Sequence, residues 1–177
     1  MADAGKAEAV LFLGDSLTEG GRWAEEFPDL DVRNFGVSGN TTQDVLDRLD
    51  DVIAAQPATV VLMAGTNDLA WRRSVEQTVR NLESILWRLH HELPSFRLIV
   101  QSVLPRDRER ADEVKQINIH LRQFAPTVKA QWLDLWPVFA DDDGEVRPSY
   151  SDDRLHLTEA GYAAWVEALR PLLKPTH

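Results

Sequence analysis

A serine lies near the start of the chain, where an apolar run ends and a helix can begin. Residues 10–13 are apolar, and Gly14 and Asp15 separate them from Ser16. The end of a buried strand fixes the backbone, and unpaired amides at a helix N-terminus can bind negative charge that forms nearby. Ser16 is therefore a candidate nucleophile. The same residues also fit a capping box from Ser16 to Glu19, in which the serine only closes the helix end.

Apolar runs of strand length alternate with segments of helical period along the whole chain. Residues 136–157 show no clear period and contain a run of Asp residues followed by Gly, which signals a turn. We expect strands over residues 10–13, 31–35, 59–63, 96–103 and 130–135. We expect helices over 17–27, 41–56, 74–93, 114–124 and 158–170, the first of them interrupted or loosened by two glycines.

This alternation predicts fold class α/β: a three-layer α/β/α sandwich, flavodoxin-like, around a sheet of about five mainly parallel strands. We expect one domain over residues 1–177, since no repeat or linker interrupts the pattern. Sites in such sheets form beyond the carboxyl ends of the strands. With the fifth strand at the far edge, residues 136–152 must return the chain across this end of the sheet.

Four short motifs follow one another in a recognisable order. They are Gly-Asp-Ser-Leu at 14–17, Gly-x-Ser-Gly-Asn at 36–40, Gly-Thr-Asn-Asp at 65–68 and Asp-x-x-His at 153–156. Each is weak alone, because short glycine-rich turns are common in α/β proteins. Together, over most of the chain, they resemble the SGNH hydrolase superfamily, also called GDSL esterases and lipases. The resemblance is closest to small bacterial acylhydrolases and to the catalytic subunits of platelet-activating-factor acetylhydrolases.

The resemblance implies a catalytic triad of Ser16, Asp153 and His156, and an oxyanion hole formed by Gly39, Asn67 and the Ser16 amide. In that arrangement His156 takes the serine proton during attack and returns it to the departing alcohol, while Asp153 holds the imidazole tautomer. Each oxyanion donor typically contributes about two to three powers of ten in rate. The implied activity is a serine esterase that hydrolyses small short-acyl carboxylic esters through an acyl-enzyme intermediate, without cofactor or metal.

Simpler interpretations of the same residues stay open. Gly39 can serve backbone conformation alone, and Asn67 can be a turn residue or a helix cap. Asp153 and His156 can be polar surface residues of a loop, and Asp152 competes with Asp153 for the triad position. A hypothesis of another class is a catalytically silent ligand-binding module on the same fold. Thioesters and O-acetylated carbohydrates are alternative substrates within the esterase class.

Four apolar residues lie in or beside the motif turns and are candidates for substrate binding. Ordinary packing is the alternative for each of them. Helices fill most connections between the motifs, so no segment is left for a large lid. We therefore expect a shallow, open cleft that accepts acyl groups from acetyl to about hexanoyl, because further methylenes would find no wall to cover them. The four candidates are Leu17, Trp71, Leu104 and Leu155.

Composition excludes several classes of protein. A formal net charge of −10 opposes nucleic-acid binding, which needs a basic face. Cysteine is absent, which excludes disulfides, thiolate metal sites and a cysteine nucleophile. Residues 9–13 are too short for a signal-peptide core, and no later apolar run reaches membrane-spanning length. We expect a cytoplasmic protein, monomer or homo-oligomer, whose partner is a small-molecule ester.

Overall fold

The computed structural model describes residues 8–174, and within this range five parallel strands form one sheet. Their order is β2-β1-β3-β4-β5, which confirms the flavodoxin-like topology. The order reverses beside β1, so the carboxyl ends of β1 and β3 flank the switch point where such folds place their sites. The strands are β1 (Val10–Gly14), β2 (Val32–Gly36), β3 (Thr59–Met63), β4 (Arg97–Gln101) and β5 (Gln131–Leu133).

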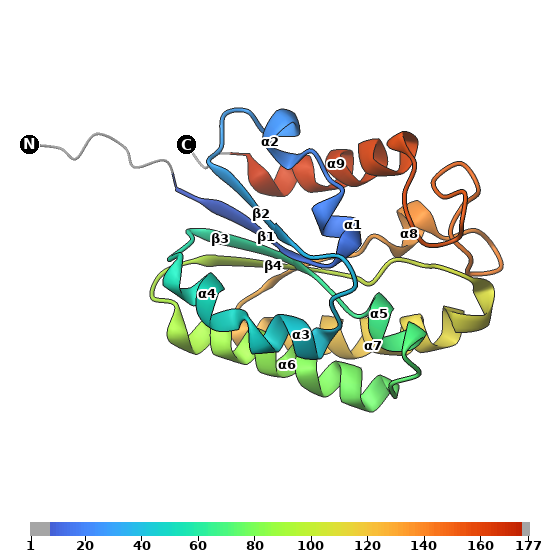
Figure 1. Ribbon diagram of the computed structural model, residues 1–177, viewed down its shortest axis with the longest axis horizontal. Helices are drawn as coiled ribbons and strands as arrows, with labels where there is room; N and C mark the ends of the chain where they lie inside the picture. Colours follow the sequence, from blue (N-terminus) through green and yellow to red (C-terminus); the bar gives the residue numbers. More distant parts are fainter. Residues whose placement is uncertain (1–7, 175–177) are drawn as a thin grey trace, which may run out of the picture.

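Helices cover both faces of the sheet and make the expected three layers (Figure 1). The final helix and three short ones cover one face: α1 (Ser16–Glu19), α2 (Trp23–Glu26), α8 (Trp136–Phe139) and α9 (Glu159–Leu173). The other face carries α3 (Thr42–Asp47), α4 (Leu49–Ala54), α5 (Thr66–Ala70), α6 (Val75–Glu92) and α7 (Ala111–Phe124), and two short 3₁₀ turns occupy Arg108–Arg110 and Ala125–Val128.

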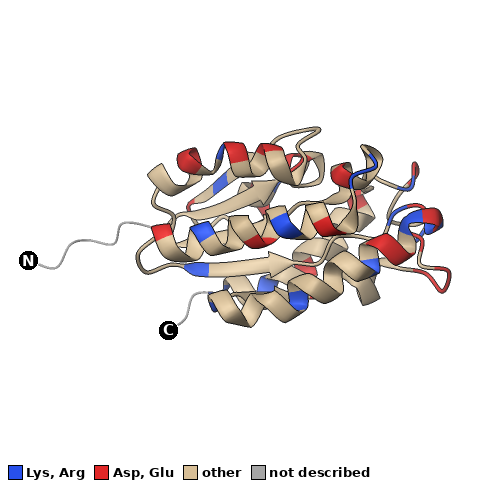
Figure 2. Ribbon diagram, turned by 90° about the horizontal axis from the view of Figure 1, so that it is seen from below, with Lys and Arg blue, Asp and Glu red and all other residues tan. Residues whose placement is uncertain are grey.

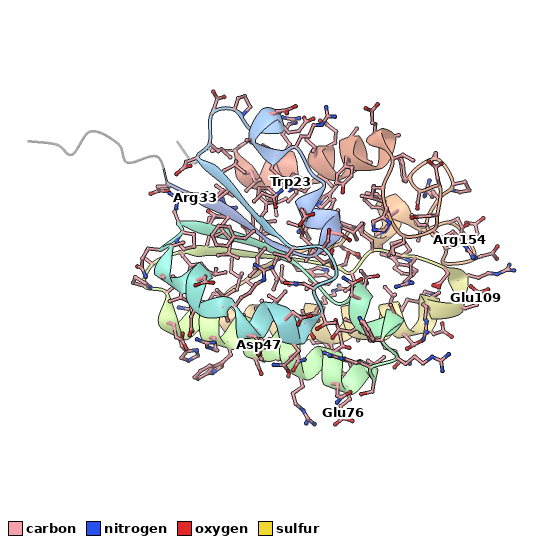
Figure 3. All side chains as sticks on the ribbon, viewed as in Figure 1. Trp23, Arg33, Asp47, Glu76, Glu109 and Arg154 are labelled. Carbon is pink, nitrogen blue, oxygen red and sulfur yellow. The ribbon has the colours of Figure 1, made fainter. Side chains whose placement is uncertain are left out.

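Alternation along the strands divides the core into two clusters. In β1, Leu11 and Leu13 pack into the cluster beneath α3, α6 and α7, whereas Phe12 belongs to the cluster beneath α9. Phe12 stacks on Trp23 with ring centroids 4.4 Å apart, and Trp165 meets the same indole edge-on at 4.8 Å. Trp23 lies between the sheet and α9 in Figure 3. Because both faces are covered, β1 and β3 are apolar over residues 10–13 and 60–63, as is typical of buried parallel strands.

Charged side chains occupy the outer faces of the helices. In the view of Figure 2, basic and acidic residues are interleaved rather than gathered by sign. Neighbouring turns of α6 illustrate this pattern, since Arg80 lies 3.0 Å from Glu76 and Arg88 lies 2.8 Å from Glu92. Such exposed pairs contribute little to stability. Over residues 8–174, no helix has both the length and the apolar character needed to cross a membrane.

Several expected boundaries are wrong. The interruption predicted within 17–27 is confirmed, since two short helices are separated at residues 20–22, but the helix over 41–56 breaks at Arg48 into α3 and α4. The last helix continues through Pro171 to Leu173, which is only 5% exposed, so its burial favours the extra turn. The segment expected to be irregular contains α8, and β4 and β5 are shorter than predicted. These boundaries depend on packing that one-dimensional periodicity does not contain.

Candidate active site

Ser16 is the first residue of α1, directly after β1. The preceding residue, Asp15, is the N-cap, and its Oδ1 accepts the Leu17 amide at 3.0 Å. The capping-box interpretation of Ser16 is therefore wrong, because a neighbouring carboxylate already caps the helix. This leaves the Ser16 hydroxyl available to other partners.

The four-residue helix α1 is held by side chains from three other elements. A helix this short has no stability of its own, and its terminal carbonyls need donors. The Trp23 indole donates to the Thr18 carbonyl at 2.8 Å, and the Asn34 amide donates to the same oxygen at 3.1 Å. The Tyr162 hydroxyl of α9 donates to the Leu17 carbonyl at 2.7 Å. Hydrogen bonds from α2, β2 and α9 thus hold the helix that begins at Ser16 in place.

The loop before α9 brings a histidine to Ser16. Ser16 Oγ lies 3.4 Å from His156 Nε2, and His156 Nδ1 lies 2.8 Å from Asp153 Oδ2. The first contact is long for a hydrogen bond, and contacts of this kind shorten when a reacting group is bound. The Leu155 and His156 amides both donate to Asp153 Oδ1, at 2.9 and 2.7 Å. Residues 136–152 therefore return the chain across the sheet, as expected.

Electrostatics keep Asp153 ionised. Partial burial acts to raise its pKa, but hydrogen bonds from the His156 side chain and from the His156 and Leu155 amides outweigh that effect and lower the pKa to about 2. The adjacent Asp152 is exposed and makes no hydrogen bond to His156 within the described residues. The geometry thus brings Asp153, rather than Asp152, to the imidazole.

The turns after β2 and β3 supply amide donors. Gly39 has φ +81°, a backbone conformation that favours glycine, and its N–H meets no acceptor in residues 8–174. Asn67, in α5, uses Nδ2 to donate to the Asn40 carbonyl at 2.9 Å, which ties its side chain to the Gly39 turn. The second N–H of that amide group is available to a further acceptor. An oxyanion hole is formed from donors of these kinds.

Two carboxylates are buried beneath this edge of the sheet. Asp68 accepts hydrogen bonds from the backbone and hydroxyl of Thr42, at 2.9 and 2.6 Å. Asp15 is only 1% exposed, and among the described residues its Oδ2 has no hydrogen-bond partner. Burial, with a smaller contribution from Asp68, raises the pKa of Asp15 to about 6. The N-cap of the candidate nucleophile helix is therefore a carboxylate under strong desolvation.

The four apolar substrate-binding candidates differ in exposure. Leu17 and Leu104 are 2% and 3% exposed and belong to the core cluster beneath α9. Leu155 is half-buried. Trp71 is 73% exposed, because an indole is difficult to bury at a turn that precedes a helix. Trp71 and Leu155 thus offer most of the free apolar surface within this set. Their contact with a substrate remains a prediction.

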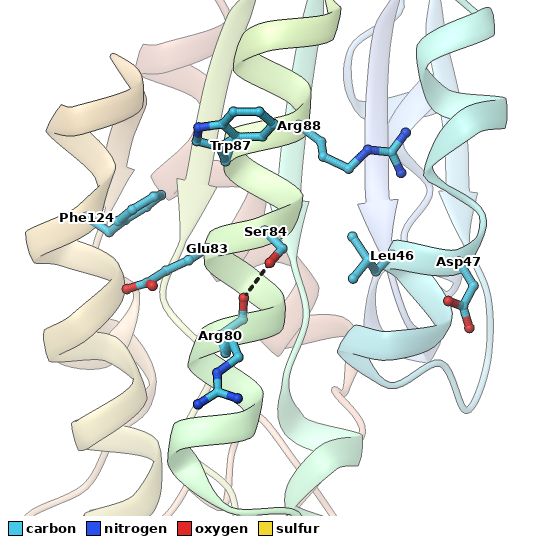
Figure 4. A pocket seen from close by; sticks show the side chains of 8 residues that line it. All are labelled: Leu46, Asp47, Arg80, Glu83, Ser84, Trp87, Arg88 and Phe124. Atoms are coloured by element: carbon cyan, nitrogen blue, oxygen red, sulfur yellow. Dashed lines mark hydrogen bonds between the residues drawn. The ribbon is translucent and has the colours of Figure 1, made fainter.

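A groove of about 700 Å³ lies elsewhere, between α3, α6 and α7 (Figure 4). Its serine, Ser84, donates back to the Arg80 carbonyl at 2.9 Å. Its Arg88 pairs with Asp50 and Glu92. The groove therefore differs from the carboxyl edge of the sheet, where a serine hydroxyl lies next to a histidine.

Two residues near the site were not predicted. Arg48 bonds to the ends of two strands and to one turn at this edge, and Glu19 accepts both the amide and the hydroxyl of Ser38, at 3.0 and 2.9 Å. A signal for Arg48 exists in the sequence, because it lies on the same helical face as the apolar Val45 and Val52. A charged residue on a buried face needs partners.

The strand order and the four motif turns are those of the SGNH hydrolase superfamily. The family model for GDSL-like lipases and acylhydrolases matches residues 12–164. The chain is 32% identical over 178 residues to the human platelet-activating factor acetylhydrolase IB subunit alpha1, covering 95% of this chain and 76% of that protein. It belongs to the GDSL-like lipase/acylhydrolase family and is a carboxylic-ester hydrolase.

Solved structures agree with this assignment. A GDSL-like lipase from Bacteroides thetaiotaomicron superposes with a TM-score of 0.79 at 27% identity, over 93% of this chain and 87% of that one. A mutant of an acetyl-xylooligosaccharide esterase from Geobacillus superposes with a TM-score of 0.78 over 95% of both chains. At 24% identity, the second likeness concerns the fold alone.

Proposed function

We propose that the chain is a serine esterase in which Ser16 is the nucleophile, His156 the general base and Asp153 the group that orients the imidazole. One observation carries the proposal: the continuous path from Ser16 Oγ to His156 Nε2 at 3.4 Å and from Nδ1 to Asp153 at 2.8 Å. A binding module without catalytic activity would not need this sequence of contacts. The oxyanion-hole donors are Gly39, Asn67 and the Ser16 amide.

The reaction proceeds in two halves. Ser16 Oγ attacks the ester carbonyl carbon while His156 Nε2 takes the hydroxyl proton, and negative charge moves to the carbonyl oxygen. Amide donors from Ser16, Gly39 and Asn67 bind that oxygen. His156 then protonates the departing alcohol, which leaves an acyl group on Ser16, and a water molecule repeats the sequence to release the acid. Asp153 accepts a hydrogen bond from His156 Nδ1–H throughout, stays ionised, and stabilises the imidazolium that forms.

Short acyl groups are the proposed substrates. The side chains of His156 and Asp153 are 56% and 55% exposed, which supports an open site without a covering lid. The human relative is named an acetylhydrolase, which is consistent with a two-carbon acyl group. Thioesters and O-acetylated carbohydrates remain alternative substrates of the same chemistry. The cytoplasmic location, the single domain and the state as monomer or homo-oligomer stay predictions.

The test is a hydrolysis series on p-nitrophenyl esters from acetate to palmitate, with Ser16→Ala beside the wild type. We expect kcat/KM to be highest between acetate and about hexanoate. Each further methylene of the acyl chain adds up to about 0.8 kcal/mol of binding free energy only if the cleft buries it. Ser16→Ala should lose nearly all turnover and all labelling by a fluorophosphonate. Ser84→Ala, in the groove of Figure 4, is the matched control and should behave as wild type.

Two outcomes would contradict parts of the proposal. Turnover retained by purified Ser16→Ala would refute the nucleophile. A maximum at palmitate, or activation by lipid droplets, would refute the open short-acyl site and leave the catalytic assignment intact.

A further inference from the structure

We infer that Arg48 is a positioning residue that holds the Gly39 turn and Asn67 in register with the Ser16 turn. The inference rests on the proposed function, because it concerns the oxyanion hole of that reaction. Arg48 touches no reacting atom in it. Its effect passes through the segments to which it bonds.

A single guanidinium joins three segments at the carboxyl edge of the sheet. Arg48 Nη2 donates to the Gly14 carbonyl at 2.9 Å and to the Phe35 carbonyl at 2.8 Å, which are at the ends of β1 and β2. Its Nε donates to Asn40 Oδ1 at 2.7 Å. The planar fork of arginine can serve several acceptors at once, whereas the single ammonium of lysine cannot reproduce this geometry.

These contacts link the turn of Ser16 to the two other proposed oxyanion donors, Gly39 and Asn67. Gly14 precedes Asp15 and Ser16, so its carbonyl fixes the strand end from which the nucleophile turn departs. Asn40 follows Gly39 directly, and its own carbonyl accepts Asn67 Nδ2 at 2.9 Å. The path from Gly14 through Arg48 and Asn40 to Asn67 thus runs through every segment that supplies an oxyanion donor.

A second clamp fixes the other side of Gly39. Glu19, in the nucleophile helix, accepts the amide and hydroxyl of Ser38 at 3.0 and 2.9 Å. Gly39 therefore lies between two residues that are each anchored by a charged side chain. The Gly39 amide has no acceptor among the described residues. A donor of an oxyanion hole needs to be free in this way, because it must bind the substrate oxygen.

Arg48 makes these bonds from a position between two helices and not from within a regular helix. Arg48 lies at the break between α3 and α4, with φ −103° and ψ 12°. It shares its helical face with Val45 and Val52, both fully buried, and is itself half-buried. Arginine stays charged under such burial, and its hydrogen bonds to carbonyls are charge-assisted and strong.

The expected effect of losing Arg48 follows from the precision that the oxyanion hole needs. Loss of a donor typically costs about 10²- to 10³-fold in kcat, and a displacement of about 1 Å can cost about 10²-fold. We expect Arg48→Ala to lower kcat by about 10- to 100-fold while KM changes by less than about threefold. Affinity for a boronic acid, which mimics the tetrahedral intermediate on Ser16, should fall in parallel.

The experiment compares Arg48→Ala, Arg48→Lys and Asn40→Ala with Arg80→Ala, an exposed arginine on α6 that serves as the matched control. Each variant is measured for kcat, KM, boronic-acid affinity and melting temperature. Arg48→Lys keeps the charge and guards against a failure of the alanine variant to fold. It should recover only part of the lost kcat. Arg48→Lys combined with Asn40→Ala should cost less than the product of the two single effects, because both break the same link.

The outcomes separate this inference from the proposed function. If Arg48→Ala and Arg48→Lys keep wild-type kcat and boronic-acid affinity while Ser16→Ala is inactive, the positioning role is wrong and the esterase proposal stands. A loss of melting temperature in Arg48→Lys with unchanged kcat would equally overturn it, since that is a structural role alone. Activity in Ser16→Ala would remove the proposed function and this inference with it.

Discussion

Replacing Asp15 by Asn should stabilise the protein at neutral pH and not at pH 4. Asp15 is 1% exposed, and its Oδ2 has no partner among the described residues, while its Oδ1 caps the nucleophile helix. An asparagine keeps the capping oxygen and removes the buried negative charge. The neutral form of the carboxyl is close to asparagine in size and polarity, so the difference between the two proteins should depend on ionisation.

The magnitude follows from the pKa of Asp15. Burial raises it from 3.8 to about 6, a difference of about 2 units, and each unit corresponds to about 1.4 kcal/mol. Between these values the folded state binds more protons than the unfolded state, so wild-type stability falls as the pH rises through about 6. The ionised carboxylate therefore costs about 3 kcal/mol at pH 7, and this cost disappears near pH 4.

Urea unfolding of Asp15→Asn and wild type at pH 4, 5, 6 and 7 measures this effect. The difference between the two proteins cancels the groups that do not interact with Asp15, such as Asp153, whose lowered pKa stabilises the fold above about pH 4 and less at lower pH. We expect the free energy of unfolding of Asp15→Asn to exceed that of wild type by up to about 3 kcal/mol at pH 7 and to match it at pH 4. The exposed Asp142→Asn is the control and should show no such trend.

A difference that stays constant from pH 4 to pH 7 would refute the reasoning, because the carboxylate would then titrate normally. A variant less stable than wild type at every pH would show that the second oxygen of Asp15 has a partner that an amide cannot replace.

Three further predictions concern single positions. Asp153→Asn should lower kcat/KM by about 10⁴-fold, as in other serine hydrolase triads, whereas Asp152→Asn should leave it within about twofold; the reverse order would reassign the triad. Gly36→Ala should lower the melting temperature or prevent folding, because a Cβ there would lie 2.2 Å from the Glu19 amide nitrogen, and a soluble variant with wild-type melting would contradict the geometry. Leu49→Ala, at a fully buried site, should cost about 2 to 5 kcal/mol in urea unfolding with unchanged slope, and a cost under 1 kcal/mol would mean that the site collapses around the cavity.

The sequence by itself determined the layers, the strand order and the motif turns. Apolar runs such as residues 59–63 predict buried parallel strands, and their alternation with helical periods predicts the sandwich. The residue types and the order of the four motifs resemble the hydrolase superfamily, and the family comparison confirmed it. These features depend on neighbouring residues or on the order of segments along the chain, so the pattern of residue types in the sequence is enough to predict them.

Only the tertiary structure decided which side chains meet. Ser16 and His156 are 140 residues apart, and the choice of Asp153 over Asp152 depends on the turn of a single loop. Sequence also could not show that Asp15 caps the helix in place of Ser16, because both are good caps. The helix that periodicity predicts to be continuous over 41–56 breaks at Arg48, whose guanidinium bonds to the ends of two strands and to a turn. Such contacts cross the chain at long range, and their geometry exists only once the sheet has formed.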